Sequence, residues 1–240
     1  MHSDIATRQV VSMASTTFSL DFAKRSLDED GVFDLETPVI GEAIRNMQQK
    51  NFPFFTEYGL HFCKEYVLNN ACITSIIESF FQGQRCILAH WLRYEAYPGH
   101  IVCFRRGGPK AGQKVLMVHL WAKGSRVDYY RGSHLHELPT EMGRRSLHEI
   151  PPAALAEVGC NATEKNFKDG GIVVLDSRVG YEMKEGYPII FEFGTEDVVK
   201  NWAKMILPKL SGLPQKVAEM ESPKIGLNFE FEDLPQPQNT

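Results

Sequence analysis

The chain has 240 residues, of which 43% are hydrophobic and 23% are charged, and its formal net charge is −4. This length and composition indicate one folded domain with a sizeable core, and the acidic balance argues against a protein that binds polyanions. The cysteines are odd in number and none lie at CxxC spacing, which argues against a disulfide framework or a zinc knuckle and predicts reduced thiols.

Two further classes of partner are disfavoured by local patterns. No apolar run approaches the roughly 18 residues that a membrane span needs, and the start of the chain lacks a basic segment followed by an apolar one. We therefore expect a cytoplasmic protein that does not bind membranes. The basic cluster at 105–110 lacks interleaved aromatic residues, so we interpret it as a solvated hairpin turn and expect no nucleic-acid partner.

The first third of the chain is predicted to be largely helical. Residues 1–36 are mixed, and we interpret them as an arm or strand that packs on the body. Pro38 is expected to open a helix that ends near Lys50. Apolar residues recur at helical spacing from Thr56 to Phe81 and predict one long helix with a buried face. Together, residues 1–84 form the expected N-terminal arm and helices.

The middle of the chain is predicted to be β-structure. Residues 85–194 alternate short apolar runs with Gly and Pro, at the spacing of a sandwich or jelly roll. Within this section, the runs Lys114–Lys123 and Arg126–Tyr130 predict two strands joined by a tight turn at Gly124 and Ser125.

The last part, 195–240, is predicted to hold one helix and a tail. Thr195 is a candidate N-cap for a helix through Leu207, which Pro208 would end. Residues 222–240 are rich in Pro and are interpreted as an extended arm. The whole chain, 1–240, is expected to be a single domain.

Three motifs follow one another in a suggestive order. The run 114–139 holds a strand with a Trp, a turn, a second strand and then Gly132-Ser133-His134 ahead of a Pro. These features, with 170–176 and 187–193 further on, resemble the phytanoyl-CoA dioxygenase-like branch of the Fe(II)/2-oxoglutarate oxygenases, over about residues 85–195. The resemblance implies a mainly β fold with flanking α-helices, namely a double-stranded β-helix (jelly roll, cupin-like).

The resemblance also implies an iron site of two His and one carboxylate, and this chain departs from it. In the family the first two ligands come as His-x-Asp or His-x-Glu, and the only match is at residues 2–4, at the extreme terminus. No His follows His148, so Gly180 or Tyr181 stands near the place of the distal ligand. No Arg follows Arg178, so Tyr187 sits near the place of the 2-oxoglutarate clamp. We therefore expect a pseudo-oxygenase with no cofactor of its own.

An alternative metal set is open in the same region. His134 and His136 would share one side of an extended segment, and Glu137, Asp128 or His119 is the candidate that would complete the site. The competing interpretation is that His134 bonds to backbone, and that His119, beside Trp121 in an apolar strand, is a core or barrel-lining residue.

Three function classes follow from this interpretation. The first is a non-catalytic subunit that pairs with a catalytically complete dioxygenase, which would carry the Fe(II) and 2-oxoglutarate. Such a heterodimer resembles those of fungal meroterpenoid pathways in secondary metabolism, and a homodimer is the other assembly considered. Phe229 and Phe231, in a Pro-flanked tail, are the expected docking residues, on the body or on a partner.

The second class is a metal-independent isomerase or cyclase acting on a hydrophobic natural product. Its catalytic candidates are His119, Tyr181 and Glu182. The expected pocket-lining residues are His119, Trp121, Tyr129, His134 and Tyr187, together with the catalytic candidates. The third class is an active oxygenase with an unorthodox ligand set.

Overall fold

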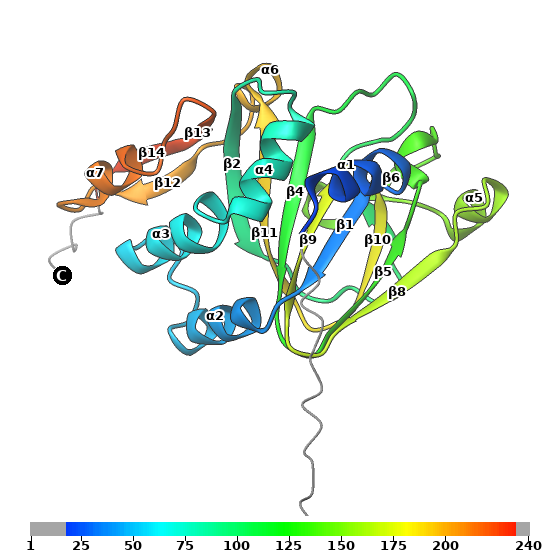
Figure 1. Ribbon diagram of the computed structural model, residues 1–240, viewed down its shortest axis with the longest axis horizontal. Helices are drawn as coiled ribbons and strands as arrows, with labels where there is room; N and C mark the ends of the chain where they lie inside the picture. The colour runs from blue at the N-terminus through cyan, green and yellow to red at the C-terminus, as the bar shows by residue number, and fades with distance from the viewer. Residues whose placement is uncertain (1–17, 234–240) are drawn as a thin grey trace, which may run out of the picture.

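Two six-stranded β-sheets face each other across the core in a computed structural model, which describes residues 18–233 (Figure 1). The first sheet has the order β1-β9-β4-β11-β2-β13. Its strands are β1 (Val32–Glu36), β9 (Gly171–Asp176), β4 (Val115–Trp121), β11 (Pro188–Thr195), β2 (Cys86–Arg93) and β13 (Ile225–Leu227). All of its pairings are antiparallel except that of β13 with β2.

The second sheet has the order β6-β7-β3-β10-β5-β8 and is antiparallel throughout. Its strands are β6 (Glu141–Met142), β7 (His148–Glu149), β3 (Val102–Cys103), β10 (Gly180–Glu185), β5 (Ser125–Tyr130) and β8 (Ala162–Phe167). The two sheets form a jelly-roll-like double-stranded β-helix, so the predicted fold class is confirmed. Strands β1 and β13 show that this barrel also uses chain outside the predicted segment 85–194.

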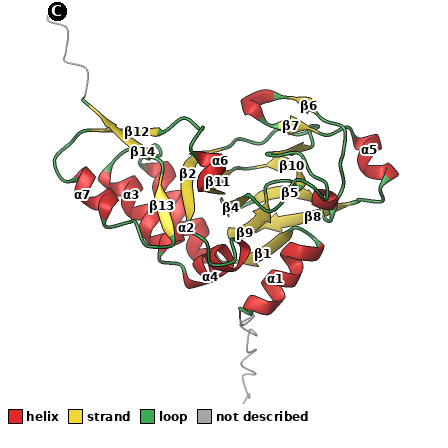
Figure 2. Cartoon of the chain, turned by 90° about the horizontal axis from the view of Figure 1, so that it is seen from above, coloured by secondary structure: helices red, strands yellow, loops and turns green. Residues whose placement is uncertain are grey.

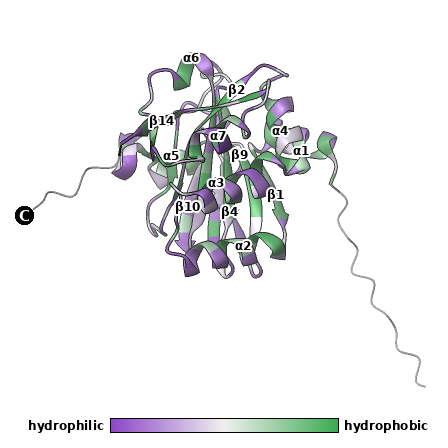
Figure 3. Cartoon of the chain, turned by 90° about the vertical axis from the view of Figure 1, so that its left-hand side faces the viewer, coloured by the Kyte–Doolittle hydropathy of each residue, from purple (hydrophilic) through white to green (hydrophobic). Residues whose placement is uncertain are grey.

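Helices cover the outer face of the first sheet, as Figure 2 shows from above. They are α1 (Leu20–Glu29), α2 (Pro38–Gln49), α3 (Glu57–Cys63) with a π-helical turn at Lys64–Leu68, and α4 (Ala71–Phe80). The outward side chains of β4, β9 and β11 and the inner faces of these helices share one large apolar cluster. The sheet is therefore buried on both sides, which explains why β4 and β9 are buried along their full length. Most residues of these two strands are hydrophobic (Figure 3).

The predicted N-terminal arm or strand is a helix followed by a strand. Within 18–36 the chain forms helix α1, capped by the hydroxyl of Ser19, which accepts from the N–H of Phe22, and then the edge strand β1. Residues 1–17 and 234–240, and with them the His-x-Asp match at residues 2–4, lie outside the described residues.

The predicted long helix 56–81 is interrupted. The side-chain oxygen of Asn70 accepts from the N–H groups of Cys72 and Ile73, so this residue caps a new helix, α4. An Asn side chain competes with the helical backbone for these donors, which favours a cap over continuation. The apolar spacing correctly indicated the buried faces of the helices. The break falls at the polar pair Asn69-Asn70, which the predicted helix spanned.

The predicted helix 195–207 is also wrong beyond its first turn. Helix α6 covers only Glu196–Val199, and Met205–Pro208 forms strand β12. Buried Met205 and Leu207 alternate with exposed Ile206, the period of a strand. After helix α7 (Leu213–Ala218), the tail supplies β13 and then β14 (Phe229–Glu232), which pairs with β12 in parallel. The tail thus docks on the body.

The turn after β4 is a corner between the sheets and does not close a hairpin. Strand β4 belongs to the first sheet and β5 to the second. Gly124 has φ +77°, a left-handed conformation that Gly adopts without strain, and its N–H donates to the carbonyl of Phe167. The remaining helix, α5 (Pro152–Glu157), lies in the connection from β7 to β8, and short 3-10 turns occur at Ser133–Leu135 and Arg144–Ser146. None of the described helices has the length and apolarity needed to span a bilayer.

Candidate functional site

Aromatic side chains fill the space between the two sheets. Trp121 from the first sheet meets Tyr129 and Tyr181 from the second, and all three are at most 1% exposed. The indole Nε1 of Trp121 donates to the hydroxyl of Tyr129 at 3.0 Å, and the Trp121 ring stacks on Phe167 with centroids 5.5 Å apart. These contacts join the sheets directly.

His119 lies in the middle of this aromatic cluster. Its ring meets those of Tyr181 and Trp121 edge to face, with centroids 5.2 and 5.8 Å apart. It is fully buried, and within residues 18–233 neither ring nitrogen has a hydrogen-bond partner. Burial lowers the pKa of His119 to about 3, so the ring is neutral at neutral pH. His119 is thus a buried residue of the barrel core, and the rings of Tyr181 and Trp121 pack against it.

Tyr181 occupies the inner face of β10, near the place expected for the family's distal ligand. Its hydroxyl is buried and has no hydrogen-bond partner in the described part of the chain, and burial raises its pKa well above the ordinary value. A neutral phenol is a poor replacement for an imidazole as an Fe(II) ligand.

The alternative metal set does not assemble. Gly132 is left-handed and starts the 3-10 turn at Ser133–Leu135, so His134 and His136 do not share one side of an extended segment. The Nε2 of His134 contacts the carbonyl of Asp28 at 3.3 Å, at the barrel rim, while His119 lies in the interior. Across residues 18–233, no group of three His, Cys, Asp or Glu side chains is placed to hold a metal ion. The residues present therefore do not fit the iron that the fold implies.

Glu182 and Tyr187 lie outside the barrel interior, which corrects their assignment to the same pocket as His119. Glu182 alternates with Tyr181 along β10 and so points outwards, where it accepts from the N–H of Gly99 at 2.6 Å and pairs with Lys184 at 2.9 Å. The hydroxyl of Tyr187 donates to Gln48 of α2 at 2.9 Å.

The barrel rim holds a buried carboxylate that the sequence analysis missed. Glu192 of β11 is 4% exposed and stands opposite His90 in the register of β11 with β2. Its carboxylate lies 3.6 Å from the Nδ1 of His90 and 3.5 Å from the hydroxyl of Tyr94. The hydrogen bond that the His90 ring donates to the carboxylate of Glu192 raises the pKa of His90, against the opposing effect of burial. The only sequence signal was one acidic residue within the apolar run 187–193.

Aromatic rings cover this pair on one side. Trp202 stacks on the ring of His90 with an interplanar angle of 3° and centroids 6.2 Å apart, and Phe104 meets Trp202 edge to face. His90 stays partly exposed, at 25% of its side chain. The rim therefore offers one accessible imidazole, oriented by a buried carboxylate, which is an arrangement suited to moving a proton.

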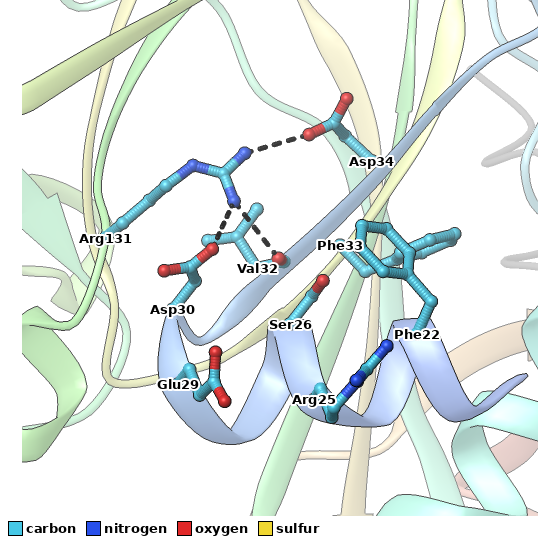
Figure 4. A pocket seen from close by; sticks show the side chains of 9 residues that line it. All are labelled: Phe22, Arg25, Ser26, Glu29, Asp30, Val32, Phe33, Asp34 and Arg131. Carbon is cyan, nitrogen blue, oxygen red and sulfur yellow. Dashed lines mark hydrogen bonds and ion pairs between the residues drawn. The ribbon is translucent and has the colours of Figure 1, made fainter.

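A hollow lies between α1 and β1 (Figure 4). It has a volume of about 390 Å³, and the guanidinium of Arg131 projects into it. That guanidinium donates to Asp30 at 3.0 Å, to Asp34 at 2.9 Å and to the carbonyl of Val32 at 3.4 Å. Because these acceptors occupy the arginine, we interpret it as a clamp that joins the chain just after β5 to the end of α1 and to β1.

Comparison with known proteins supports the fold class and goes no further. No protein-family model matches the chain, and no curated protein matches it in sequence. Among solved structures, AviO1 from Streptomyces viridochromogenes is similar, with a TM-score of 0.50 and 14% identity, over 76% of this chain and 97% of that one. The non-heme alpha ketoglutarate dependent epimerase SnoN from nogalamycin biosynthesis also has a TM-score of 0.50, with 10% identity, over 73% of this chain and 83% of that one.

SnoN has also been solved in complex with Fe3+, alpha ketoglutarate and nogalamycin RO. At these identities the similarity is one of fold. The chain thus shares the double-stranded β-helix of these structures, and within residues 18–233 it lacks a side-chain cluster placed to hold a metal ion.

Proposed function

We propose that this protein is a non-catalytic subunit that pairs with a catalytically complete oxygenase relative and stabilises it. The partner would supply Fe(II) and 2-oxoglutarate, in a fungal secondary-metabolite pathway of the meroterpenoid type. The observation that carries the proposal is the filled barrel centre, where His119 is enclosed by aromatic rings. Packing of this kind stabilises the barrel and serves no ligand, so the fold is retained for its surface.

The small sheet of β12 and β14 is our candidate for that surface. The ring of Phe229 packs edge to face on Trp91 with centroids 5.0 Å apart, which anchors the tail to the body. Phe231 is half-buried beside it, and Ile206 and Leu210 are 42% and 45% exposed. Among residues 18–233, neither strand of this two-stranded sheet has a second partner strand at its outer edge, which a strand from another chain can extend.

Co-expression with a relative that retains His-x-Asp, the distal His and the Arg tests the proposal. We expect the two chains to elute together at a 1:1 ratio and the relative to turn over faster in the complex than alone. Ile206→Asp should weaken the complex, whereas Val158→Asp, at the opposite end of the molecule beside α5 (Figure 1), should not. Separate elution together with full activity of the relative alone would count against the subunit role.

A second candidate function is metal-independent proton transfer on a hydrophobic natural product, and the rim pair favours it. The reactive groups first expected, His119 and Tyr181, are enclosed, whereas His90 is accessible and oriented by Glu192. Turnover of a candidate substrate by the chain alone is the assay. Loss of turnover in His90→Gln, with His119→Leu unaffected, would support this function, and turnover insensitive to His90→Gln would exclude the rim pair.

A further inference from the structure

A cavity opens beside the rim pair, where residues that follow β2 meet the connection between β6 and β7. Its apolar floor is formed by Leu147 and Met183, which are 4% and 3% exposed, and its walls by the rings of Tyr94 and Tyr97. The volume is about 130 Å³. This is below the roughly 300–1,000 Å³ of sites that enclose a whole drug-sized molecule, so the cavity can take one end of a ligand.

Two adjacent arginines stand at the opening of this cavity. The guanidinium carbon of Arg144 lies 5.3 Å from the ring centroid of Tyr97, and that of Arg145 lies 5.2 Å from that of Tyr94. Adjacent residues of an extended segment point to opposite sides. Here Arg145 and Ser146 have φ +55° and +58°, left-handed values that are strained for side chains of this kind, and the turn brings both guanidinium groups to the same opening.

No acidic side chain of the described residues neutralises either arginine. Within residues 18–233 neither guanidinium has an ion-pair partner, whereas six other arginines do: Arg45, Arg85, Arg93, Arg126, Arg131 and Arg178.

The carboxylates near the cavity are engaged elsewhere. Glu95 lines the cavity and pairs with Arg93 at 2.6 Å. Glu149 lies 3.0 Å from the Nδ1 of His100, and it also accepts from the hydroxyl of Tyr97 at 3.4 Å. Glu192, on the inner side of Tyr94, is bonded to His90 and Tyr94. The cavity mouth is therefore cationic although the whole chain is acidic.

We propose that this cavity binds amphiphilic carboxylic acids. The carboxylate lies between the guanidinium groups of Arg144 and Arg145, and a ring or chain end enters the cavity to contact Leu147 and Met183. Arginines already stacked on aromatic rings are preorganised for a planar carboxylate, which accepts two parallel hydrogen bonds from such a fork. The site belongs to this chain alone and does not depend on the proposed partner.

Naphthalene-1-acetate and its neutral amide, naphthalene-1-acetamide, are suitable probes because they share the ring and differ in charge. By calorimetric titration of the full chain, we expect the acid to bind at least ten times more tightly than the amide, with an affinity that falls as salt rises. Upfield shifts of the Tyr94 and Tyr97 ring signals in NMR spectra should place the ring in the cavity. Equal binding of the two probes, or binding of neither, would overturn the proposal.

Variants of the chain locate the charge. Arg144→Gln with Arg145→Gln should weaken binding of the acid at least tenfold and leave the amide unaffected. The matched control is Lys50→Gln, which removes another exposed cation stacked on a tyrosine, 4.9 Å from the ring of Tyr58, and should change nothing. Wild-type affinity in the double variant would refute the assignment. So would displacement of the acid by an equal concentration of 2-oxoglutarate, a short dianion without an apolar end.

Discussion

The indole N–H of Trp121 donates to the hydroxyl of Tyr129 at 3.0 Å, across the interior of the barrel from one sheet to the other. Both side chains are buried, so water cannot replace either group of this hydrogen bond. Loss of the Tyr129 hydroxyl would therefore leave the indole donor without an acceptor.

Tyr129→Phe is therefore expected to lower the free energy of unfolding by roughly 1–3 kcal/mol, which is the penalty for an unsatisfied buried donor. The measurement is urea denaturation followed by tryptophan fluorescence. Tyr130→Phe is the control, because Tyr130 is the next residue of β5, points the other way and is half-buried. A Tyr129→Phe chain as stable as the control would mean that the indole finds another acceptor.

The enclosed His119 predicts a dependence of stability on pH. Its pKa is about 3 in the folded chain and 6.5 ordinarily, so the unfolded chain binds the proton more readily. Above pH 6.5 the neutral His119 therefore costs the folded state no stability. As the pH falls from 6.5 towards 3, the free energy of unfolding decreases. Between pH 7 and pH 5 this one residue should remove about 2 kcal/mol.

His119→Leu should abolish the part of the stability loss between pH 7 and pH 5 that His119 causes. At pH 7 it should be neutral or stabilising, because both ring nitrogens lack partners and the substitution breaks no hydrogen bond. Urea titrations at both pH values measure the effect, with His61→Gln as the control on an exposed histidine. An unchanged pH dependence in His119→Leu would show that His119 is solvated or paired in solution.

Much of the barrel could be predicted from sequence because its strands are locally coded. The run 114–123 is apolar on both faces, and the structure places β4 at Val115–Trp121, covered by helices on one side and the second sheet on the other. Helix α2 likewise began at the predicted Pro38. In each case the pattern within the segment was sufficient.

The rim site could not be predicted, because it depends on pairing between distant strands. His90 was set aside for want of a carboxylate two residues on, yet its carboxylate comes from the register of β2 with β11. The pocket assigned around His119 failed for a similar reason, since Glu182 and Tyr187 face away from it. Sequence motifs placed β4, β5, β9 and β11 correctly, and side-chain orientation required the register.

The His90–Glu192 pair predicts a change in titration. Glu192 raises the pKa of His90, so the pair stabilises the fold most below the ordinary value of 6.5 and loses this contribution as the pH rises through the folded pKa. Glu192→Gln should lower the pKa of His90, because a neutral amide no longer attracts the proton while burial still opposes the charge. An NMR titration of the His90 ring protons reports it. Glu230→Gln, on an exposed residue, should leave the titration unchanged, and an unaltered pKa in Glu192→Gln would show that the pair does not form.

Arg126 of β5 and Arg131, the first residue after that strand, offer a matched test of the clamp in Figure 4. Arg131 is bound by Asp30, Asp34 and a backbone carbonyl and is 26% exposed, whereas Arg126 makes more exposed ion pairs with Glu164 and Glu185. Hydrogen bonds between charged groups are worth more where water is partly excluded, so Arg131→Ala should cost roughly 2 kcal/mol and Arg126→Ala less than about 1 kcal/mol.

Thermal and urea unfolding of both variants at low and high salt measure the difference. Salt should erase most of the small Arg126 effect, while the Arg131 effect should largely persist, because the clamp also holds the carbonyl of Val32 and ties the end of α1 to β1. Equal losses in the two variants, removed together by salt, would instead mean that α1 is held to the barrel by apolar packing alone.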